Sequence, residues 1–547
     1  MDTYMVQVAG MTCDSCNDHV AEALSRAGAT DIVADWRKGE ARFSAQDPDF
    51  ERLSAEITGA GYGPGAVRRV TSATPREEGH LSDADYDLAI VGSGSAAFAA
   101  AIRASDLGAR VAMIERGEIG GTCVNVGCVP SKAMLRAAEA CFRANHPVHR
   151  GVPTTCGPVD LDELVRHTDE LVADLRQEKY LDLVTAYGFE LIRGEARFVG
   201  PEALDVEGRR IVADRYLVAT GASPAVPPIQ GLAEAGYLTS TDALQLRSLP
   251  PAIAVIGANA IGLELGQLFL HLGSRVEFFD VAERIAPFEE PEVSDALSKI
   301  LEGEGAGVHP AAQITAVRAD AGRRIVVAEI AGASREFPVD EVLVATGRRP
   351  NTADLVLSAA GVQVDERGAI VIDERSQTTN PRIFAAGDCT GAPQFVYVAA
   401  HQGALAAENA LSAEGRTLDL SALPRVTFTN PQIAAVGVTE AQAREAGHEV
   451  KVSELGLGKV PRALVNRDTR GLVKLVADAR TDRLLGASML AEGAGDAIQA
   501  AVLAVKFGLT TRELAETFHP YLTMAEALKL AAQAFDRDVA LLSCCAA

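Results

Sequence analysis

Six of the nine cysteines in this chain stand in three close pairs. The pairs are Cys13 with Cys16, Cys123 with Cys128, and Cys544 with Cys545. A thiolate is the nucleophile of disulfide exchange and a preferred ligand of soft metal ions, so two thiols can carry two electrons or hold one such ion. This spacing predicts redox or metal chemistry rather than a disulfide framework.

The central pair lies in the segment GGTCVNVGCVPSK, which also contains Lys132. Two thiols with an apolar four-residue spacer, placed beside a dinucleotide fold, are suited to a two-electron role. The alternative is an inert or zinc-binding pair, for which the spacer and the following lysine serve no purpose. We therefore predict that Cys123 and Cys128 are redox-active.

The remaining cysteines differ from one another in what they can do. Cys544 and Cys545 are adjacent and could form a disulfide only through a strained ring, so a dithiol role at the chain end is predicted, with a dispensable tail as the alternative. Cys141, Cys156 and Cys389 stand alone, and we expect them to pack as small apolar residues without a function.

Length and charge exclude several classes of protein. A chain of 547 residues is too long for one hydrophobic core, so three or four domains are expected. The net charge of -23 repels phosphate backbones, and nucleic acid is not expected as a partner. No apolar run is long enough to span a bilayer, and the acidic start MDTYMVQVAG does not resemble a secretory signal. We expect a cytoplasmic protein without membrane insertion.

The first 68 residues have the pattern of a small βαββαβ unit, a ferredoxin-like metal-binding domain. A strand-like segment leads into the loop GMTCDSC, and an amphipathic stretch follows with Val20, Ala23 and Leu24 on one face. A helix N-terminus lowers thiol pKa, so Cys13 and Cys16 are placed to capture a metal ion. Residues 69–85 are polar and predict a flexible linker.

A dinucleotide fingerprint begins after the strand YDLAIVG. Gly92, Gly94 and Ala97 stand at a tight turn that opens a helix, and Glu115 ends the next strand. The glycines let backbone amides approach a pyrophosphate, and the carboxylate can bind ribose hydroxyls. This arrangement predicts a first Rossmann-like site.

A second fingerprint follows Pro251, with Gly257 and Gly262 in place and Asn259 at the middle position. Asn tolerates a positive φ better than most residues, so we expect the turn to survive. Asp280 ends the next strand, and an acid there favours a free ribose 2′-hydroxyl and therefore NADH. Arg284 lies one turn later and weakens that preference.

The segments GGTCVNVGCVPSK, YLVATGASP, VLVATGRRPN and RIFAAGDC resemble the pyridine nucleotide-disulfide oxidoreductase family over roughly residues 85–535. The resemblance implies an α/β protein with two doubly wound Rossmann-like domains and an α+β dimerisation domain, FAD, NADPH or NADH as electron donor, and a homodimer. The implied ranges are 86–222 and 348–420 for FAD, 223–347 for NAD(P)H, 421–536 for the interface domain and 537–547 for the tail.

Several roles follow from the same resemblance. Cys128 would be the thiol that contacts the flavin, Cys123 the exchange thiol, Lys132 a cation near the flavin ring, and Asp388 a ligand of the ribityl and phosphate region. Further cofactor-binding residues implied by the motifs are Gly121, Thr122, Thr220, Gly221, Glu264 and Gly347.

One segment departs from the family pattern. The family supplies a His-Glu pair as acid-base catalyst, whereas HPYLTMAEALKL, aligned on Glu526, has Tyr521 in place of the histidine. A disulfide substrate needs a proton for its leaving thiolate, and a phenol with a pKa near 10 supplies it poorly, whereas a metal ion needs no such proton. His519 is displaced from the position of the missing base.

Tyr521, the terminal cysteine pair and the N-terminal unit, which is similar to heavy-metal-associated domains, together resemble the mercuric reductases. This implies reduction of thiol-bound Hg(II) to Hg(0) by NAD(P)H through FAD, with Tyr180 near the inner metal site. The ion would pass from Cys13 and Cys16 to the tail pair, and then to the Cys123–Cys128 pair of the partner subunit.

Three alternatives remain open at this point. The chain could be a disulfide reductase like dihydrolipoamide dehydrogenase, a view that Asp280 supports and Tyr521 opposes. It could be a metal-sequestering protein, which leaves two dinucleotide sites unexplained. Its N-terminal unit could be a copper chaperone-like module.

Overall fold

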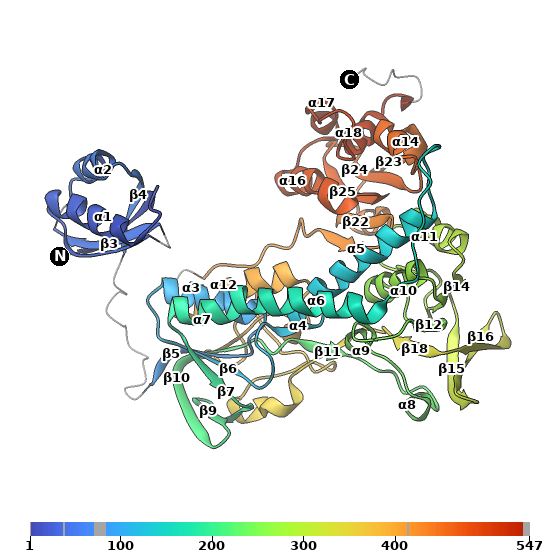
Figure 1. Ribbon diagram of the computed structural model, residues 1–547, viewed down its shortest axis with the longest axis horizontal. Helices are drawn as coiled ribbons and strands as arrows, with labels where there is room; N and C mark the ends of the chain where they lie inside the picture. The colour runs from blue at the N-terminus through green and yellow to red at the C-terminus, as the bar shows by residue number, and fades with distance from the viewer. Residues whose placement is uncertain (1, 37–38, 47, 71–83, 413–414, 540–547) are drawn as a thin grey trace. The chain divides into compact units, whose positions relative to one another are not determined.

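The computed structural model describes residues 2–36, 39–46, 48–70, 84–412 and 415–539 (Figure 1). The chain divides into two compact units, one built chiefly from residues 1–85 and the other from residues 86–547. Most of the predicted linker and of the predicted tail, including Cys544 and Cys545, lies outside the described residues. Within the described ranges, no helix combines the length and apolar character needed to cross a membrane.

The N-terminal unit has the predicted βαββαβ order. Its elements are β1 (Asp2–Ala9), α1 (Asp14–Arg26), β2 (Thr30–Asp35), β3 (Glu40–Ala45), α2 (Phe50–Gly59) and β4 (Gly63–Val70). The sheet order is β2-β3-β1-β4, with antiparallel pairing throughout. Val20, Ala23 and Leu24 are fully buried, as the amphipathic pattern of α1 predicts.

Two doubly wound sheets form the centre of the larger unit, which confirms the predicted fold class. In the first, β5 (Tyr86–Val91) pairs in parallel with β6 (Val111–Glu115) and β10 (Arg209–Val218), and α3 (Ser95–Asp106) connects β5 to β6. In the second, β12 (Ala252–Ile256) pairs in parallel with β13 (Arg275–Phe279) and β18 (Glu341–Val344). Both first strands are buried along their whole length, because helices cover parallel sheets on two faces.

The structure adds antiparallel strands that the sequence reasoning did not predict. β15 (Gln313–Asp320), β16 (Arg323–Ile330) and β17 (Ala333–Val339) form a separate three-stranded sheet. β8 (Ala196–Gly200) and β9 (Ala203–Val206) extend the first sheet beyond β10. Their polar residues alternate with apolar ones over short spans, a weaker signal than a buried parallel strand.

The interface domain is an α+β layer pair, as predicted. Its five-stranded antiparallel sheet has the order β21-β22-β25-β24-β23. The strands are β21 (Arg425–Thr427), β22 (Gln432–Gly437), β23 (Val450–Gly456), β24 (Leu472–Asp478) and β25 (Leu484–Ala491). Helices α16 (Gln499–Phe507), α17 (Thr511–Glu516) and α18 (Glu526–Gln533) pack with it at the orange and red end of Figure 1.

A helical hairpin connects the redox segment to the rest of the first domain. It consists of α5 (Cys128–Asn145) and α6 (Leu161–Arg176), with the loop 146–160 between them. A disulfide joins Cys141 on α5 to Cys156 in the loop, with a Cα–Cα distance of 5.1 Å. The prediction that these two cysteines have no function was wrong, because fifteen residues of sequence separate two thiols that the hairpin brings together. Cys389 is fully buried, as expected.

Removal of this disulfide is expected to destabilise the hairpin. Replacement of Cys141 and Cys156 by Ser releases a cross-link that restricts the unfolded chain, which corresponds to about 3 kcal/mol for a loop of this length. The measurement is thermal unfolding with and without a reductant. The reductant should lower the wild-type midpoint and leave that of the variant unchanged; a wild-type midpoint that ignores the reductant would contradict a structural disulfide.

Candidate active site

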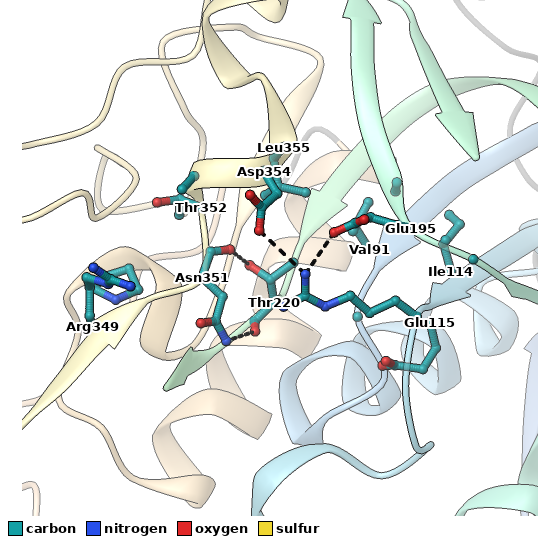
Figure 2. A pocket seen from close by; sticks show the side chains of 16 residues that line it. Val91, Ile114, Glu115, Glu195, Thr220, Arg349, Asn351, Thr352, Asp354 and Leu355 are labelled. Atoms are coloured by element: carbon teal, nitrogen blue, oxygen red, sulfur yellow. Dashed lines mark hydrogen bonds and ion pairs between the residues drawn. The ribbon is translucent and has the colours of Figure 1, made fainter. Parts of the chain in front are cut away.

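The first glycine fingerprint forms one wall of a pocket. Gly92 has a φ of +111°, and a Cβ there would lie 2.4 Å from the carbonyl oxygen of Ala219, so only glycine fits. The pocket lining includes Gly92, Glu115 and Thr220, and it continues to Asn351 and Asp354 (Figure 2). Because a tight glycine turn and the carboxylate of Glu115 meet here, the pocket fits the adenosine end of FAD.

The redox segment contacts this turn directly through its backbone. Gly121 begins the short helix α4 (Gly121–Asn125), followed by Thr122 and Cys123. Gly121 has a φ of +64°, and a Cβ on it would lie 2.6 Å from the Cα of Gly94. Ala97, three residues after Gly94, is fully buried in α3. The predicted cofactor-binding glycines and the redox cysteines are therefore held together by main-chain contact.

Cys123 and Cys128 form a hydrogen-bonded thiol pair at the junction of α4 and α5. The hydrogen bond from Cys123 lowers the pKa of Cys128 to about 6, against the opposing effect of burial, and the Lys132 ammonium lowers it further. The same bond, together with burial, raises the pKa of Cys123. The arrangement therefore favours the thiolate at Cys128, with Cys123 as the protonated partner.

Lys132 is fixed by residues from two other domains. Its Nζ lies 2.7 Å from Oε2 of Glu264, which is buried on α10 (Ala260–Leu272). Oε1 of Glu264 accepts the backbone N–H of Phe428 at 2.8 Å, and the Lys132 ammonium lies 4.8 Å from the centre of the Phe428 ring. A residue of each domain thus contributes to the placement of the cation beside Cys128.

The two charges have opposite effects on the thiolate, which gives a prediction about pH. Lys132 lowers the pKa of Cys128 and Glu264 raises it. Lys132→Met should therefore move the thiolate titration to higher pH, and Glu264→Gln should move it to lower pH. The measurement is thiolate absorbance of the reduced, anaerobic protein between pH 5 and pH 9. Shifts of equal sign in the two variants would contradict this electrostatic account.

Asp388 lies near the redox pair in a second charged contact. Its carboxylate is 3.8 Å from the guanidinium of Arg348. Burial raises the pKa of Asp388, and Arg348 opposes that shift. Burial lowers the pKa of Arg348, and the charges of Asp388 and Cys128 oppose that shift, which places this guanidinium within electrostatic range of the thiol pair. Sequence reasoning missed Arg348, although the motif VLVATGRRPN contains it.

The other predicted cofactor residues lie in two chain segments that pair as short antiparallel strands. β11 (Ala222–Pro224) follows Thr220 and Gly221, and it pairs with β19 (Arg348–Pro350), which follows Gly347. The Thr220 hydroxyl donates to the carbonyl of Asn351 at 2.7 Å. Gly221 has a φ of +68° and Gly347 a φ of +120°, so both need glycine. This strand pair closes the pocket of Figure 2.

Tyr180 lies in a π-helical turn, Gln177–Leu181, that directly follows α6. Its ring packs edge-on against Phe98 with a centroid distance of 4.8 Å, so the side chain is partly buried. Burial, and then the charge of Cys123, raises the pKa of Tyr180. The hydroxyl is therefore protonated and within electrostatic range of the thiols. π-Helical turns inside helices frequently occur at functional sites.

The second fingerprint forms the same kind of turn as the first. Gly257 has a φ of +102°, and a Cβ on Gly262 would lie 1.8 Å from the carbonyl oxygen of Gly257. Asn259 has an extended backbone with a φ of -111°, so its tolerance of positive φ is not used, and that part of our expectation was wrong. Asp280 follows β13 and lies beside this turn. The arrangement fits NAD(P)H.

Tyr521 and Glu526 lie outside the thiol site of their own chain. Figure 1 shows α17 and α18, which flank Tyr521 in sequence, far from α4 and beyond the five-stranded sheet. Tyr521 is 49% exposed, and Oε2 of Glu526 accepts the backbone N–H of Leu522 at 3.3 Å. His519 is half-buried, and its Nδ1 lies 3.0 Å from the carbonyl oxygen of Thr517.

Large apolar side chains are exposed in the same part of the interface domain. Phe518 is 98% exposed and Phe507 is 69% exposed, and Leu503 on α16 is half exposed. Exposed apolar residues grouped along one segment mark a surface that another protein covers. Residues 503–521 therefore have the character of a subunit interface.

Cys13 and Cys16 face each other in the N-terminal unit, with 3.4 Å between their sulfur atoms. Cys16 is buried in the first turn of α1, and Cys13 is exposed. The backbone N–H of Thr12 and then the Tyr62 hydroxyl lower the pKa of Cys16 to about 6. The hydrogen bond to Cys16 raises the pKa of Tyr62 to about 12. One thiolate and one accessible thiol are thus placed for a two-coordinate soft ion.

Comparison with known proteins identifies the larger unit. A family model described as pyridine nucleotide-disulphide oxidoreductase matches residues 86–403, and its dimerisation domain matches residues 423–532. The chain is 31% identical to the HOCl-induced flavoprotein disulfide reductase RclA from Escherichia coli, with a TM-score of 0.74 over 82% of this chain and 99% of that one. LpdA from Mycobacterium tuberculosis has the same TM-score at 26% identity, over 82% of this chain and 98% of that one.

Curated relatives match over nearly the whole chain. Mercuric reductase from Staphylococcus aureus is 49% identical over 100% of this chain and 99% of its own length. Mercuric reductase from Streptomyces lividans is 51% identical over 84% of this chain and 98% of its own length. The chain therefore belongs to the pyridine nucleotide-disulfide oxidoreductase family, and within that family to the mercuric reductases.

Proposed function

We propose that this protein reduces thiol-bound Hg(II) to Hg(0) with electrons from NAD(P)H, using FAD and the Cys123–Cys128 pair. The observation that carries the proposal is the main-chain contact between the redox segment and the first glycine turn, which joins the thiol pair to a dinucleotide fold. The interface segment of the same chain has Tyr521 in place of the disulfide-reductase histidine. The names of the relatives support the same substrate.

The residues of the chain bind the metal and hold its ligands in place. FAD, when bound, supplies the two-electron chemistry that links the nicotinamide to the thiols. Cys128 offers a thiolate, and Cys123 becomes the second sulfur ligand when its proton leaves as Hg(II) binds. Lys132, fixed by Glu264, stabilises negative charge beside this pair. Two electrons delivered to Hg(II) give Hg(0) and release both sulfur atoms as thiolates, and Cys123 then takes up a proton from solvent.

The proposal includes a path for the ion through exchange of thiolate ligands. An incoming thiolate displaces a bound one, as in disulfide exchange, so the ion never needs to dissociate fully. The sulfur atoms of Cys13 and Cys16 are close together and Cys16 is acidic, which supports capture by the N-terminal unit. The tail pair Cys544–Cys545 would accept the ion next and deliver it to Cys123 and Cys128.

The match to a dimerisation domain indicates a homodimer. Tyr521 lies on the exposed apolar segment of the interface domain and away from the thiols of its own chain. Both facts support a site that two subunits complete together. We propose that Tyr521, Glu526 and the tail act on the partner subunit's thiol pair. Tyr180 would act on the thiol pair of its own chain.

The test uses the purified full-length protein with FAD. Oxidation of NAD(P)H should depend on Hg(II) supplied with excess thiol, and elemental mercury vapour should appear in proportion. Lipoamide and glutathione disulfide should support little turnover in the same assay. Rapid lipoamide reduction without mercury vapour would favour the disulfide-reductase alternative. Binding of Hg(II) without continued NAD(P)H oxidation would favour sequestration.

A further inference from the structure

The second dinucleotide site has a carboxylate that is held in one orientation. Ile256, the last residue of β12, pairs with Phe279 of β13, so Asp280 follows directly beside the Gly257 turn. Its Oδ2 accepts the backbone N–H of Ala258 at 2.7 Å, and its Oδ1 accepts the N–H of Ala282 at 2.9 Å. A carboxylate has about four acceptor sites, so two remain for a ligand.

The first dinucleotide site contains the same arrangement. Glu115 accepts the hydroxyl of Ser93 at 2.6 Å, and Ser93 directly follows Gly92 just as Ala258 follows Gly257. Glu115 also accepts the N–H of Gly117 at 2.6 Å, two residues later, as Asp280 accepts that of Ala282. The chain therefore places a fixed carboxylate at the equivalent point of both folds.

The first site fits the adenosine of FAD, whose ribose carries a free 2′-hydroxyl. A carboxylate with two remaining acceptor sites suits two ribose hydroxyls, which are donors. A 2′-phosphate brings acceptors and negative charge instead, and Asp280 would repel it. The exposed carboxylate of Glu283 adds negative charge three residues along the chain.

We propose that Asp280 selects NADH over NADPH as the electron donor of this protein. The proposal rests on the proposed function only in that a nicotinamide supplies the electrons. Arg284 lies four residues after Asp280, and its buried Nε has no hydrogen-bond partner within the described residues. If Arg284 instead paired with a 2′-phosphate, NADPH would be preferred, so the experiment includes that residue.

The experiment measures binding and flavin reduction without mercury. Calorimetric titration of the oxidised holoenzyme with NAD⁺ and NADP⁺ gives the two dissociation constants, and anaerobic stopped-flow with NADH and NADPH gives the two rates of flavin reduction. The wild type should favour the unphosphorylated coenzyme by about tenfold or more, because removal of a like-charge contact changes binding on that scale. Asp280→Asn should largely remove the preference.

Two variants serve as controls. Glu283→Gln removes a neighbouring exposed carboxylate and should leave most of the preference. Arg284→Gln should change the dissociation constants of NAD⁺ and NADP⁺ by similar factors. A wild-type preference for NADP⁺ and NADPH, or an unchanged ratio in Asp280→Asn, would overturn the proposal. Neither measurement contains mercury, so the coenzyme preference can be interpreted even if the mercury assay fails.

Discussion

Cys128→Ala should reduce Hg(II) turnover by at least about a thousandfold, because it removes the thiolate that the site stabilises. The hydrogen bond from Cys123 lowers the pKa of Cys128 to about 6, which supports the proposed role of this sulfur as the metal ligand beside the flavin. Turnover is measured as mercury-dependent NADH oxidation together with release of mercury vapour. Reduction of the flavin by NADH should survive, since the second fingerprint is separate from the thiols.

A matched control separates this effect from a general loss of structure. Cys389→Ser changes a fully buried cysteine whose thiol already donates to the carbonyl oxygens of Val218 and Ala386, and a hydroxyl can make the same bonds. Its turnover should remain near that of the wild type. Near-normal mercury reduction by Cys128→Ala, with FAD still bound, would remove the inner pair from the mechanism.

Replacement of both Cys544 and Cys545 by Ala should have its largest effect when Hg(II) arrives on a bulky thiol. Small complexes can reach Cys123 and Cys128 directly, whereas a large ligand must first be exchanged at an accessible pair. We expect a loss of about tenfold or more in kcat/KM with glutathione as ligand and a small loss with a small inorganic ligand. Equal losses with all ligands would contradict a transfer role for the tail.

Hybrid dimers show which subunit the tail serves. One subunit carries Cys128→Ala with an intact tail, and its partner carries the tail replacement with an intact inner pair. If the tail crosses between subunits, the hybrid holds one complete site and reduces mercury from bulky ligands at about half the wild-type rate per dimer. If each tail serves its own subunit, the hybrid has no complete site and is as slow as the tail variant.

Local patterns in the sequence predicted much of the fold. Continuous apolar strands before Gly92 and Gly257 indicated parallel sheets, and the helical period of residues 17–27 identified the buried face of α1. The redox pair was found because both cysteines and Lys132 lie within one short segment. Signals of this kind depend on neighbours in sequence.

Contacts between distant segments could not be predicted in the same way. The Cys141–Cys156 disulfide depends on how the hairpin loop returns to α5, which no spacing rule encodes. The contact of Glu264 with the backbone of Phe428 joins residues 164 positions apart. The ring contact of Tyr180, in its π-helical turn, with Phe98 of α3 likewise joins segments that are distant in sequence. These features arise from tertiary packing.

The close approach of Gly121 to Gly94 limits which substitutions the redox segment can accept. The cofactor turn and the redox helix meet through main-chain atoms, so their spacing does not depend on the identity of any side chain at the contact. A Cβ at position 121 would lie 2.6 Å from the Cα of Gly94, so a substitution there would force the two segments apart. The separation of the cofactor turn and the redox helix therefore depends more on the absence of a side chain at position 121 than on the side chains around it.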